Sequence, residues 1–367
     1  MPLSNPSSGG EGATNKGKAW IAHGNNVVTF AAAHADTNYR WVVHLAQAAI
    51  SGITPRNVPH TRGMSLAVAN ETTTRGKVRL DGGYGFTTCG YQGSSLVGTT
   101  QRYDNIANGH TTRANATARQ NPAGFSLGGY GFALTGYNGS YLNTNERFDD
   151  VANGYTARAN ALWNTTEQSG YSLGGYGFVL KGWVGSVQYR FDDAINGWAS
   201  RTPGYSCGHP AGYSTTSYGF SSGGTSNGSN YIATTERFDD VANGHTGRAN
   251  LNAARRSLSG YLLDGYGFAL CGYNGSYSGT NERFDDIANA HGYRAGHNVR
   301  EQPWGFALNG FGFMACGWNS SSGQLWYVDR YDDVTNNLLN AASATTRTRI
   351  AGYATNEYWV NYATFEA

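Results

Sequence analysis

The chain has 367 residues, a formal net charge of +2 and only 14% charged residues. This length can form one large domain or two ordinary ones with a substantial core. The balanced charge offers no basic footprint for nucleic acid. No apolar run approaches the ~20 residues that a membrane-spanning helix needs. We therefore expect neither nucleic acid as a partner nor insertion into a membrane.

The composition favours an all-β fold. Glycine is abundant at 52 residues, aromatic residues make up 13% of the chain, and there are 8 prolines. Aromatic residues favour strands, and glycine favours the tight turns between them. This mixture indicates short strands joined by turns and argues against a disordered polymer.

The N-terminal region differs in kind from the rest of the chain. Residues 1–17 are rich in Ser, Gly and Asn and predict an extended arm. Residues 1–10 contain neither a basic start nor an apolar stretch, so we expect no secretory signal peptide. Residues 18–76 include two strand-like segments, 27–30 and 38–45, and predict a β-rich segment.

From about residue 77 the chain repeats. An arginine, an aromatic residue and an aspartate follow one another six times, at steps of 43 to 47 residues. The six arginines are Arg102, Arg147, Arg190, Arg237, Arg283 and Arg330. A fixed period of this length is typical of a repeat array, in which each repeat is too small to bury its own apolar face.

One repeat, residues 125–171, shows the expected internal structure. Strand-like segments at 124–127, 130–137, 144–148 and 155–158 are separated by turns rich in Gly, Asn and Asp. Four short antiparallel strands in a unit of about 46 residues are typical of a β-propeller blade. We therefore predict an all-β propeller over residues 77–367, with one blade per repeat.

Closure of the ring is open to two interpretations. Residues 349–362 match the first two strands of a blade, after which the chain stops. We favour seven blades, with this half repeat supplying the inner strands of the last one and residues 18–76 its outer strands. The alternative is six blades with the tail over the seam, and a separate small sandwich formed by residues 18–76.

The repeats resemble kelch repeats, of the kind found in bacteriophage virion proteins such as tail-fibre and decoration subunits. The resemblance is carried by the small-residue strand end (Gly223-Gly224), the Tyr/Phe-Asp pair and the aromatic residue after it, such as Tyr155 or Trp198. The usual glycine doublet is mostly Thr-Gly, Cys-Gly or Lys-Gly. The N-terminal segment resembles small β-sandwich modules of phage tails related to H-type lectins.

The features that recur in every repeat predict structural roles. The first aspartate of each turn should accept backbone N–H bonds, with a calcium-binding role as the alternative. A second set, Arg113, Arg158, Arg201, Arg248 and Arg294, should tie adjacent blades, with binding of an anionic glycan as the alternative, and Ala341 interrupts it. The histidines and the four cysteines show no metal-ligand spacing, and the cysteines are expected to be unpaired thiols. We expect no catalytic residues, no metal and no cofactor.

The features that vary predict recognition. Two families of variable loops join strands two and three, and strand four to the next blade; both should lie on one face. Their aromatic residues are the candidate binding residues: Trp163, Trp183, nearby Trp304, Trp318, Trp326 and Tyr327. Aromatic faces among amides and hydroxyls suit either a glycan or a protein partner.

These observations favour a non-enzymatic virion protein: a bacteriophage tail-fibre, receptor-binding or decoration subunit that binds a host-surface glycan or protein. Such a protein would be made in the host cytoplasm and would join other virion subunits in an oligomeric assembly through its N-terminal region. The alternatives are an extracellular, secreted or filament-forming bacterial structural protein, and a propeller enzyme.

Overall fold

The computed structural model describes residues 83–180, 182, 188–226 and 230–355. Outside these it describes four strands, β1 (Val27–Thr29), β2 (Leu66–Ala69), β3 (Lys77–Leu80) and β32 (Ala363–Glu366). Two compact units result: Gly83–Glu357, and Met1–Gly82 together with Tyr358–Ala367. In the second unit the four strands form one sheet in the order β1-β32-β3-β2. The predicted arm, residues 1–17, and the predicted strand at 38–45 lie outside the described residues.

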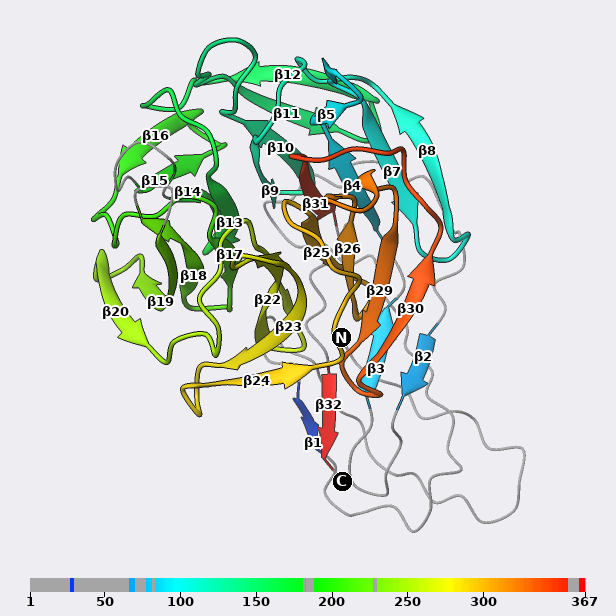
Figure 1. Cartoon of the computed structure of the whole chain (residues 1–367). Helices are drawn as coiled ribbons and strands as arrows, with labels where there is room; N and C mark the ends of the chain where they lie inside the picture. The colour runs from blue at the N-terminus through cyan, green and yellow to red at the C-terminus, as the bar shows by residue number, and fades with distance from the viewer. Residues whose placement is uncertain are drawn as a thin grey trace. The chain divides into compact units, whose positions relative to one another are not determined.

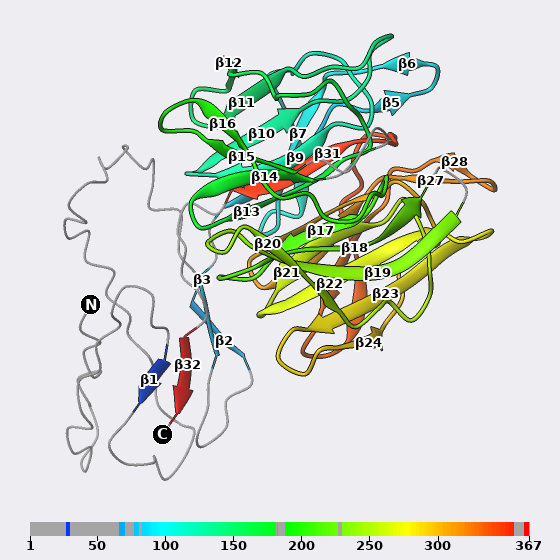
Figure 2. The same ribbon diagram turned by 90° about the vertical axis from the view of Figure 1, so that its left-hand side faces the viewer.

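The unit Gly83–Glu357 is a ring of four-stranded antiparallel blades, six within the described residues (Figures 1 and 2). From the inner to the outer edge, blade 1 consists of β31 (Ala351–Thr355), β4 (Tyr84–Thr88), β7 (Thr100–Asp104) and β8 (Gly109–Arg113). Blade 2 consists of β9 (Ala123–Leu127), β10 (Tyr130–Leu134), β11 (Asn145–Asp149) and β12 (Gly154–Arg158). Blade 3 consists of β13 (Ser169–Leu173), β14 (Tyr176–Leu180), β15 (Gln188–Asp192) and β16 (Gly197–Ser200). Blade 4 consists of β17 (Ala211–Ser214), β18 (Gly219–Ser226), β19 (Asn230–Asp239) and β20 (Gly244–Arg248). Blade 5 consists of β21 (Ser259–Leu263), β22 (Tyr266–Tyr273), β23 (Tyr277–Asp285) and β24 (Ala290–Arg294). Blade 6 consists of β25 (Trp304–Leu308), β26 (Phe311–Ala315), β29 (Val328–Asp332) and β30 (Asn337–Ala341). Two short hairpins, β5 (Tyr91–Gln92) with β6 (Ser95–Leu96) and β27 (Trp318–Asn319) with β28 (Gly323–Gln324), project from the loops.

The ring closes with six blades, so the favoured prediction of seven is corrected. The C-terminal half repeat does supply an inner strand, as predicted: β31 pairs with β4 in blade 1, with Tyr353 opposite Phe86. Strand β3, which precedes β4 in sequence, pairs instead with β2 and β32. The propeller thus begins at Gly83 rather than at residue 77. Residues 18–76 contribute β1 and β2 to the other sheet, not outer strands to a closing blade.

Steric fit explains this choice of strand. Every inner strand carries an aromatic ring that covers a glycine of the next blade, as Tyr353 covers Gly131 and Phe306 covers Gly85, so a Cβ at either glycine would collide with the ring. Counting back from Tyr84 as from Tyr130 puts Arg79 at the position of the ring. A buried, unpaired guanidinium there would cost several kcal/mol. The Gly-Tyr pair at residues 352–353 fits instead.

Aromatic stacking continues from blade to blade around the ring. Within each blade the inner-strand ring stacks on the phenylalanine of the second strand, for example Phe306 on Phe313 at a centroid distance of 5.3 Å. That phenylalanine also meets the aromatic residue of the third strand in the next blade, as Phe313 meets Tyr103 at 5.2 Å. Such pairs each add about 0.5–1.5 kcal/mol beyond the area they bury. The repeated motif aromatics are therefore core residues.

The repeated aspartates and arginines have the structural roles predicted for them. In the turn after each third strand, the first aspartate accepts backbone N–H bonds, as Asp149 does from Val151 at 3.0 Å. The second aspartate is held by two arginines of the preceding blade. Asp150, for example, lies 3.1 Å from Arg102 and 2.8 Å from Arg113. Its charge is thus compensated by guanidinium groups.

The seam between blades 6 and 1 lacks this clamp. Asn105 stands where the other five turns have the second aspartate, and Ala341 stands where the preceding blade should have its second arginine. The second aspartate and the second arginine are thus both replaced by uncharged residues, whereas the first arginine, Arg330, is retained and lies over the ring of Phe311 at 4.8 Å. The seam keeps the neutral hydrogen bond found at the other seams, here from Ala342 N to Asn108 Oδ1 at 2.7 Å and elsewhere, for example, from Ala114 N to Asn153 Oδ1 at 2.8 Å.

Buried ion pairs lie inside several blades. Arg255 pairs with Glu282, and Arg300 with Asp329 at 2.6 Å, and the side chains of all four are fully buried. Burial opposes ionisation of Asp329, but hydrogen bonding from His297 and the charge of Arg300 lower the pKa of its carboxyl on balance. Arg347 occupies the equivalent position in blade 1, and its partner is the neutral Gln101 at 3.0 Å. Burial lowers the pKa of Arg347.

Stability should fall in mild acid. Burial lowers the pKa of His110 and His297, and that of His291 to about 4. The unfolded chain, with histidine near pKa 6.5, binds protons that these folded side chains exclude. The stabilising contribution is therefore complete above pH 6.5, and for His291 it is lost as the pH falls from 6.5 towards 4. Urea unfolding at several pH values should show this decline.

The variant His291→Tyr provides the control. Blade 2 carries Tyr155 at the equivalent position, with its hydroxyl 2.7 Å from Thr100. In blade 5, His291 similarly contacts Thr235 at 3.2 Å. The variant should remain folded and show a shallower acid decline than the parent. An unchanged pH profile would contradict the assignment of this decline to His291.

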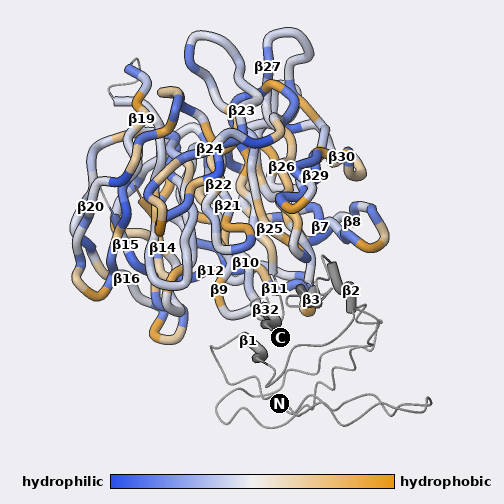
Figure 3. Tube along the Cα trace, turned by 90° about the horizontal axis from the view of Figure 1, so that it is seen from below, coloured by the Kyte–Doolittle hydropathy of each residue, from blue (hydrophilic) through white to orange (hydrophobic). Residues whose placement is uncertain are grey.

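The two variable loop families meet at the same end of the blades, as predicted. Backbone bridges join them, for instance Glu301 with Trp318 and Arg256 with Tyr273. We call this end the loop face. At the other end of each sheet, every turn after a third strand exposes a Val or Ile, and Val241 and Ile287 are each 99% exposed. Hydrophobic segments accordingly appear at the edge of the ring as well as inside it (Figure 3).

All four cysteines, Cys89, Cys207, Cys271 and Cys316, are buried free thiols. Burial raises the pKa of Cys89 to about 11 and that of Cys271 to about 12, so these side chains stay protonated and pack as small apolar groups. Among the residues that the structure describes, no helix has the length and apolarity to cross a membrane.

Candidate binding site at the centre of the loop face

Six polar residues encircle the centre of the propeller at the loop face. One stands shortly before each inner strand, and we call them the mouth ring: Asn121, Glu167, His209, Ser257, Gln302 and Arg349. All six have positive φ, between 50° and 65°. This left-handed conformation is uncommon for residues other than glycine and costs of order 1–3 kcal/mol where it is not locally favoured. Glycine would avoid that cost, so the retained side chains call for an explanation.

The backbone conformation is held by bonds from blade to blade. Each of four mouth-ring N–H groups donates to the carbonyl of the mouth-ring residue in the preceding blade. The bonds are Asn121 to Arg349 at 2.8 Å, Glu167 to Asn121 at 3.4 Å, His209 to Glu167 at 3.0 Å, and Gln302 to Ser257 at 3.1 Å. We call this set of backbone bonds the collar. It holds the six side chains on rigid elements, as a preorganised site requires.

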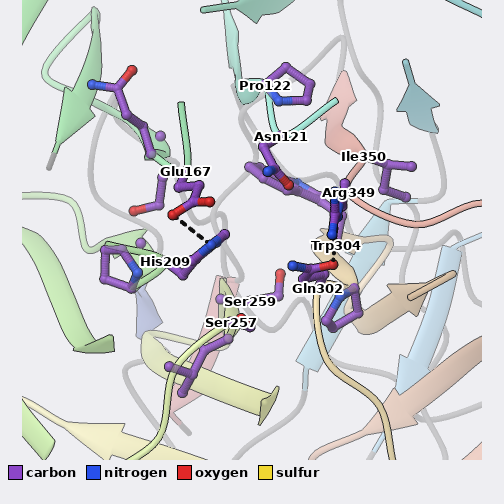
Figure 4. A pocket seen from close by; sticks show the side chains of 18 residues that line it. Asn121, Pro122, Glu167, His209, Ser257, Ser259, Gln302, Trp304, Arg349 and Ile350 are labelled. Carbon is purple, nitrogen blue, oxygen red and sulfur yellow. Dashed lines mark hydrogen bonds and ion pairs between the residues drawn. The ribbon is translucent and has the colours of Figure 1, made fainter. Parts of the chain in front are cut away.

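The side chains surround a small cavity of about 50 Å³ (Figure 4). On one side, His209 Nε2 lies 2.8 Å from a carboxylate oxygen of Glu167. On another, Arg349 donates to Gln302 at 3.2 Å and to Gln120 at 2.6 Å. A cavity of this size admits a few water molecules or one polar group of a ligand, not a whole ligand.

The mouth ring is chemically diverse where the blades are not. Around it each repeat keeps a glycine and an aromatic residue in the same places, yet the six positions carry two amides, a hydroxyl, an imidazole, a carboxylate and a guanidinium. Scaffold positions in a repeat array need the same residue in each copy, as the Asp and Gly positions show. Six polar side chains that differ from repeat to repeat line one cavity, so these positions are the candidates for ligand contact.

Aromatic side chains border the mouth ring. Tyr91, Tyr137, Tyr273 and Trp318 follow the glycine that ends the second strand in four blades, and all are half-buried. Neighbouring rings extend this border. Tyr277 contacts both Tyr273, at a centroid distance of 5.2 Å, and Trp318, at 5.3 Å. The site thus combines a polar centre with an aromatic rim.

The predicted binding residues are spread over the loop face. Trp304 begins β25 and lines the central cavity, and Trp318 belongs to the aromatic rim. Trp326 and Tyr327 lie together at a second cavity in blade 6, described below. Trp163 is 52% exposed on the connection from blade 2 to blade 3 and lines neither cavity. Trp183 lies outside the described residues.

Sequence reasoning missed the mouth ring because it searched the loops for aromatic residues. A signal was available: four positions before the inner-strand aromatic, the aligned repeats read Asn, Glu, His, Ser, Gln and Arg. In the part of the chain that the structure describes, no cluster of three or more His, Cys, Asp or Glu side chains could hold a metal ion.

Comparison with known proteins shows which solved structure this fold resembles. No protein-family profile and no curated protein sequence matches the chain. Among solved structures, it is similar to the propeller titled "Structure of YjhT", with a TM-score of 0.60 and 10% sequence identity over 77% of this chain and 99% of that one. The described part of the unit Gly83–Glu357 is a six-bladed β-propeller. At this level of identity the similarity concerns the fold alone.

Proposed function

We propose that this protein is a non-enzymatic recognition subunit of a virion, of the bacteriophage tail-fibre, receptor-binding or decoration type with kelch-like repeats. It would use the loop face to bind a glycan on the host surface. The mouth ring carries this proposal, because six different polar side chains on a rigid collar provide the donors and acceptors that match sugar hydroxyls. The aromatic rim adds apolar faces suited to sugar rings.

Replacing mouth-ring residues by glycine should separate binding from folding. In the triple variant Glu167→Gly, His209→Gly and Arg349→Gly, we expect the free energy of unfolding to change by less than about 2 kcal/mol, since glycine adopts positive φ freely. Binding to the glycans that the parent chain selects on an array should weaken at least tenfold, equal to a loss of about 1.4 kcal/mol or more.

A matched control uses positive-φ residues away from the mouth. Asp264 and Asn309 have φ of 54° and 52° in turns where blades 2 and 3 carry glycine. The double variant Asp264→Gly and Asn309→Gly should bind as the parent does. If the triple variant also keeps full binding, the mouth ring is not the recognition site. If the parent binds a host protein but no glycan, the proposed ligand class is wrong.

The Glu167–His209 pair favours a second candidate, a propeller enzyme that uses acid–base chemistry. A carboxylate in contact with an imidazole can hold and move a proton, and Arg349 shares the same cavity. NMR spectra of a selected glycan before and after incubation with the protein distinguish the two functions. An unchanged glycan supports recognition, and a changed one supports catalysis.

Placement in an assembly is the remaining part of the proposal. The ring of exposed Val and Ile side chains in the turns offers apolar contacts for neighbouring subunits at the end away from the loops. The N-terminal region would supply the docking element. A cryo-EM map of the native particle tests this directly. Burial of the loop face against other subunits would instead favour the secreted or filament-forming alternative.

A further inference from the structure

A second cavity, of about 570 Å³, lies at the loop face of blade 6. This volume falls within the range of about 300–1,000 Å³ usual for small-ligand sites. Its wall combines two aromatic residues with amides and a hydroxyl from three segments of the chain: Trp326, Tyr327, Asn298, Asn319, Asn340 and Ser343. Unlike the mouth ring, this site belongs to one part of the ring.

The cavity carries no formal charge. Its lining contains no Asp, Glu, Lys, Arg or His. The substitution at the seam contributes to this, because Ala341 lines the cavity where the other five repeats have an arginine. The nearest ion pair, Arg300 with Asp329, is fully buried and mutually compensated. A charged ligand group would lose hydration here without gaining a counter-ion.

The aromatic platform is held in place before any ligand arrives. Trp326 is 41% exposed, but its carbonyl accepts a bond from Ala344 N at 2.9 Å. The next carbonyl, of Tyr327, accepts one from Cys316 N at 2.9 Å, and the two rings lie 4.9 Å apart. The contact with the Tyr327 ring restricts the indole before a ligand binds, which reduces the entropy cost of ordering it.

The polar wall is also preorganised. Asn319 accepts bonds from the backbone of Ser321 at 3.1 Å and of Ser322 at 2.7 Å. Its amide nitrogen donates to Val299 O at 3.2 Å, which ties the β27–β28 hairpin to the connection from blade 5. The amide nitrogen of Asn298 donates to Asp329 Oδ1 at 3.0 Å, which fixes that side chain, and the exposed Asn340 and Ser343 offer both donors and acceptors.

We propose that this cavity binds a neutral pyranose unit of a glycan, with its apolar face on Trp326 and its hydroxyls towards the asparagine amides. Aromatic face, amides and absence of charge together select an uncharged polyhydroxylated ring over an acidic or basic one. This site is separate from the mouth ring, so it stands even if the central site recognises another ligand.

The test uses saturation-transfer NMR titrations of the full chain with methyl hexopyranosides of glucose, galactose, mannose and N-acetylglucosamine, and with the methyl glucuronide. We expect at least one neutral glycoside to bind with a Kd on the order of millimolar, as befits a single sugar unit. The glucuronide should bind at least tenfold more weakly. Trp326→Ala should weaken the neutral glycoside at least tenfold, and Asn340→Ala should also weaken it.

Trp163→Ala is the matched control, since it removes another exposed tryptophan that lines neither cavity, and it should bind as the parent does. The triple mouth-ring glycine variant should also retain this binding, which separates failure here from failure of the central site. Three results would each overturn the proposal. The parent and Trp326→Ala could bind the neutral glycoside equally, or the glucuronide could bind as tightly as the neutral glycoside. The third is that no neutral glycoside binds at a concentration 100-fold above about 1 mM.

Discussion

Truncation of the chain after Arg349 should abolish cooperative unfolding of the propeller. The deletion removes β31, whose residues Ala351 and Tyr353 are buried and whose backbone pairs with β4 along its length. Loss of the Tyr353 ring alone compares with core aromatic truncations that cost about 3–5 kcal/mol. For a domain of this size, each kcal/mol lowers Tm by about 2–4 °C. Calorimetry should therefore show a broad transition at least about 10 °C below that of the parent.

A second truncation isolates the role of the inner strand. Ending the chain after Glu357 keeps β31 and removes β32, which belongs to the other unit. Its propeller transition should remain sharp and close in temperature to that of the full chain. If truncation after Arg349 melts as sharply and as hot as truncation after Glu357, closure by β31 does not hold the ring together.

Removal of the buried carboxylate of Glu282 should be strongly destabilising, because both side chains of its ion pair with Arg255 are fully buried. The variant Glu282→Ala leaves the guanidinium of Arg255 fully buried without a counter-ion, which typically costs about 3–5 kcal/mol. Glu282→Gln should cost less, because Gln101 already serves the equivalent Arg347 in blade 1. Urea unfolding monitored by fluorescence measures both.

Two comparisons make this expectation specific. Blade 3 carries Thr165 and Tyr189 at the positions of Arg255 and Glu282, so the double variant Arg255→Thr and Glu282→Tyr should be more stable than Glu282→Ala. Asp150→Asn breaks a less buried pair and reproduces Asn105 of blade 1, with an expected cost of about 1 kcal/mol or less. Equal losses for Glu282→Ala and Asp150→Asn would refute the importance of burial.

The mouth ring and the blade 6 cavity both depend on residues that differ between the repeats. At the mouth ring every repeat differs, which yields one composite site from six blades. At the blade 6 cavity a single repeat departs from the others, because Ala341 replaces the arginine of the other five. Two sites on one face would let a branched glycan be held at two points, with the gain in avidity that follows when both can be reached at once.

The sequence by itself determined the blade. Each Arg-aromatic-Asp motif lies on a third strand, the Asp and Asn residues after it form the turn, and the glycines before it admit the neighbouring aromatic ring. These are local or nearest-neighbour requirements, repeated in every unit, so the repeat pattern was enough to predict strands, turns and a propeller. The arginines were predicted to tie adjacent blades, but their pairing with the second aspartates was not predicted, although Asn105 and Ala341 replace two of the partners at one seam.

The sequence predicted that the C-terminal half repeat supplies an inner strand, but only the tertiary structure decided that this strand joins β4 to close six blades, and where the site lies. Closure joins residues more than 260 positions apart, such as Tyr353 and Phe86, and the choice between β3 and β31 depends on which strand fits beside Gly124 and over Gly131. The mouth ring depends on that closure, because Arg349 reaches Asn121 only when the last inner strand enters the first blade. Such contacts are set by packing between distant segments, which a local sequence pattern does not encode.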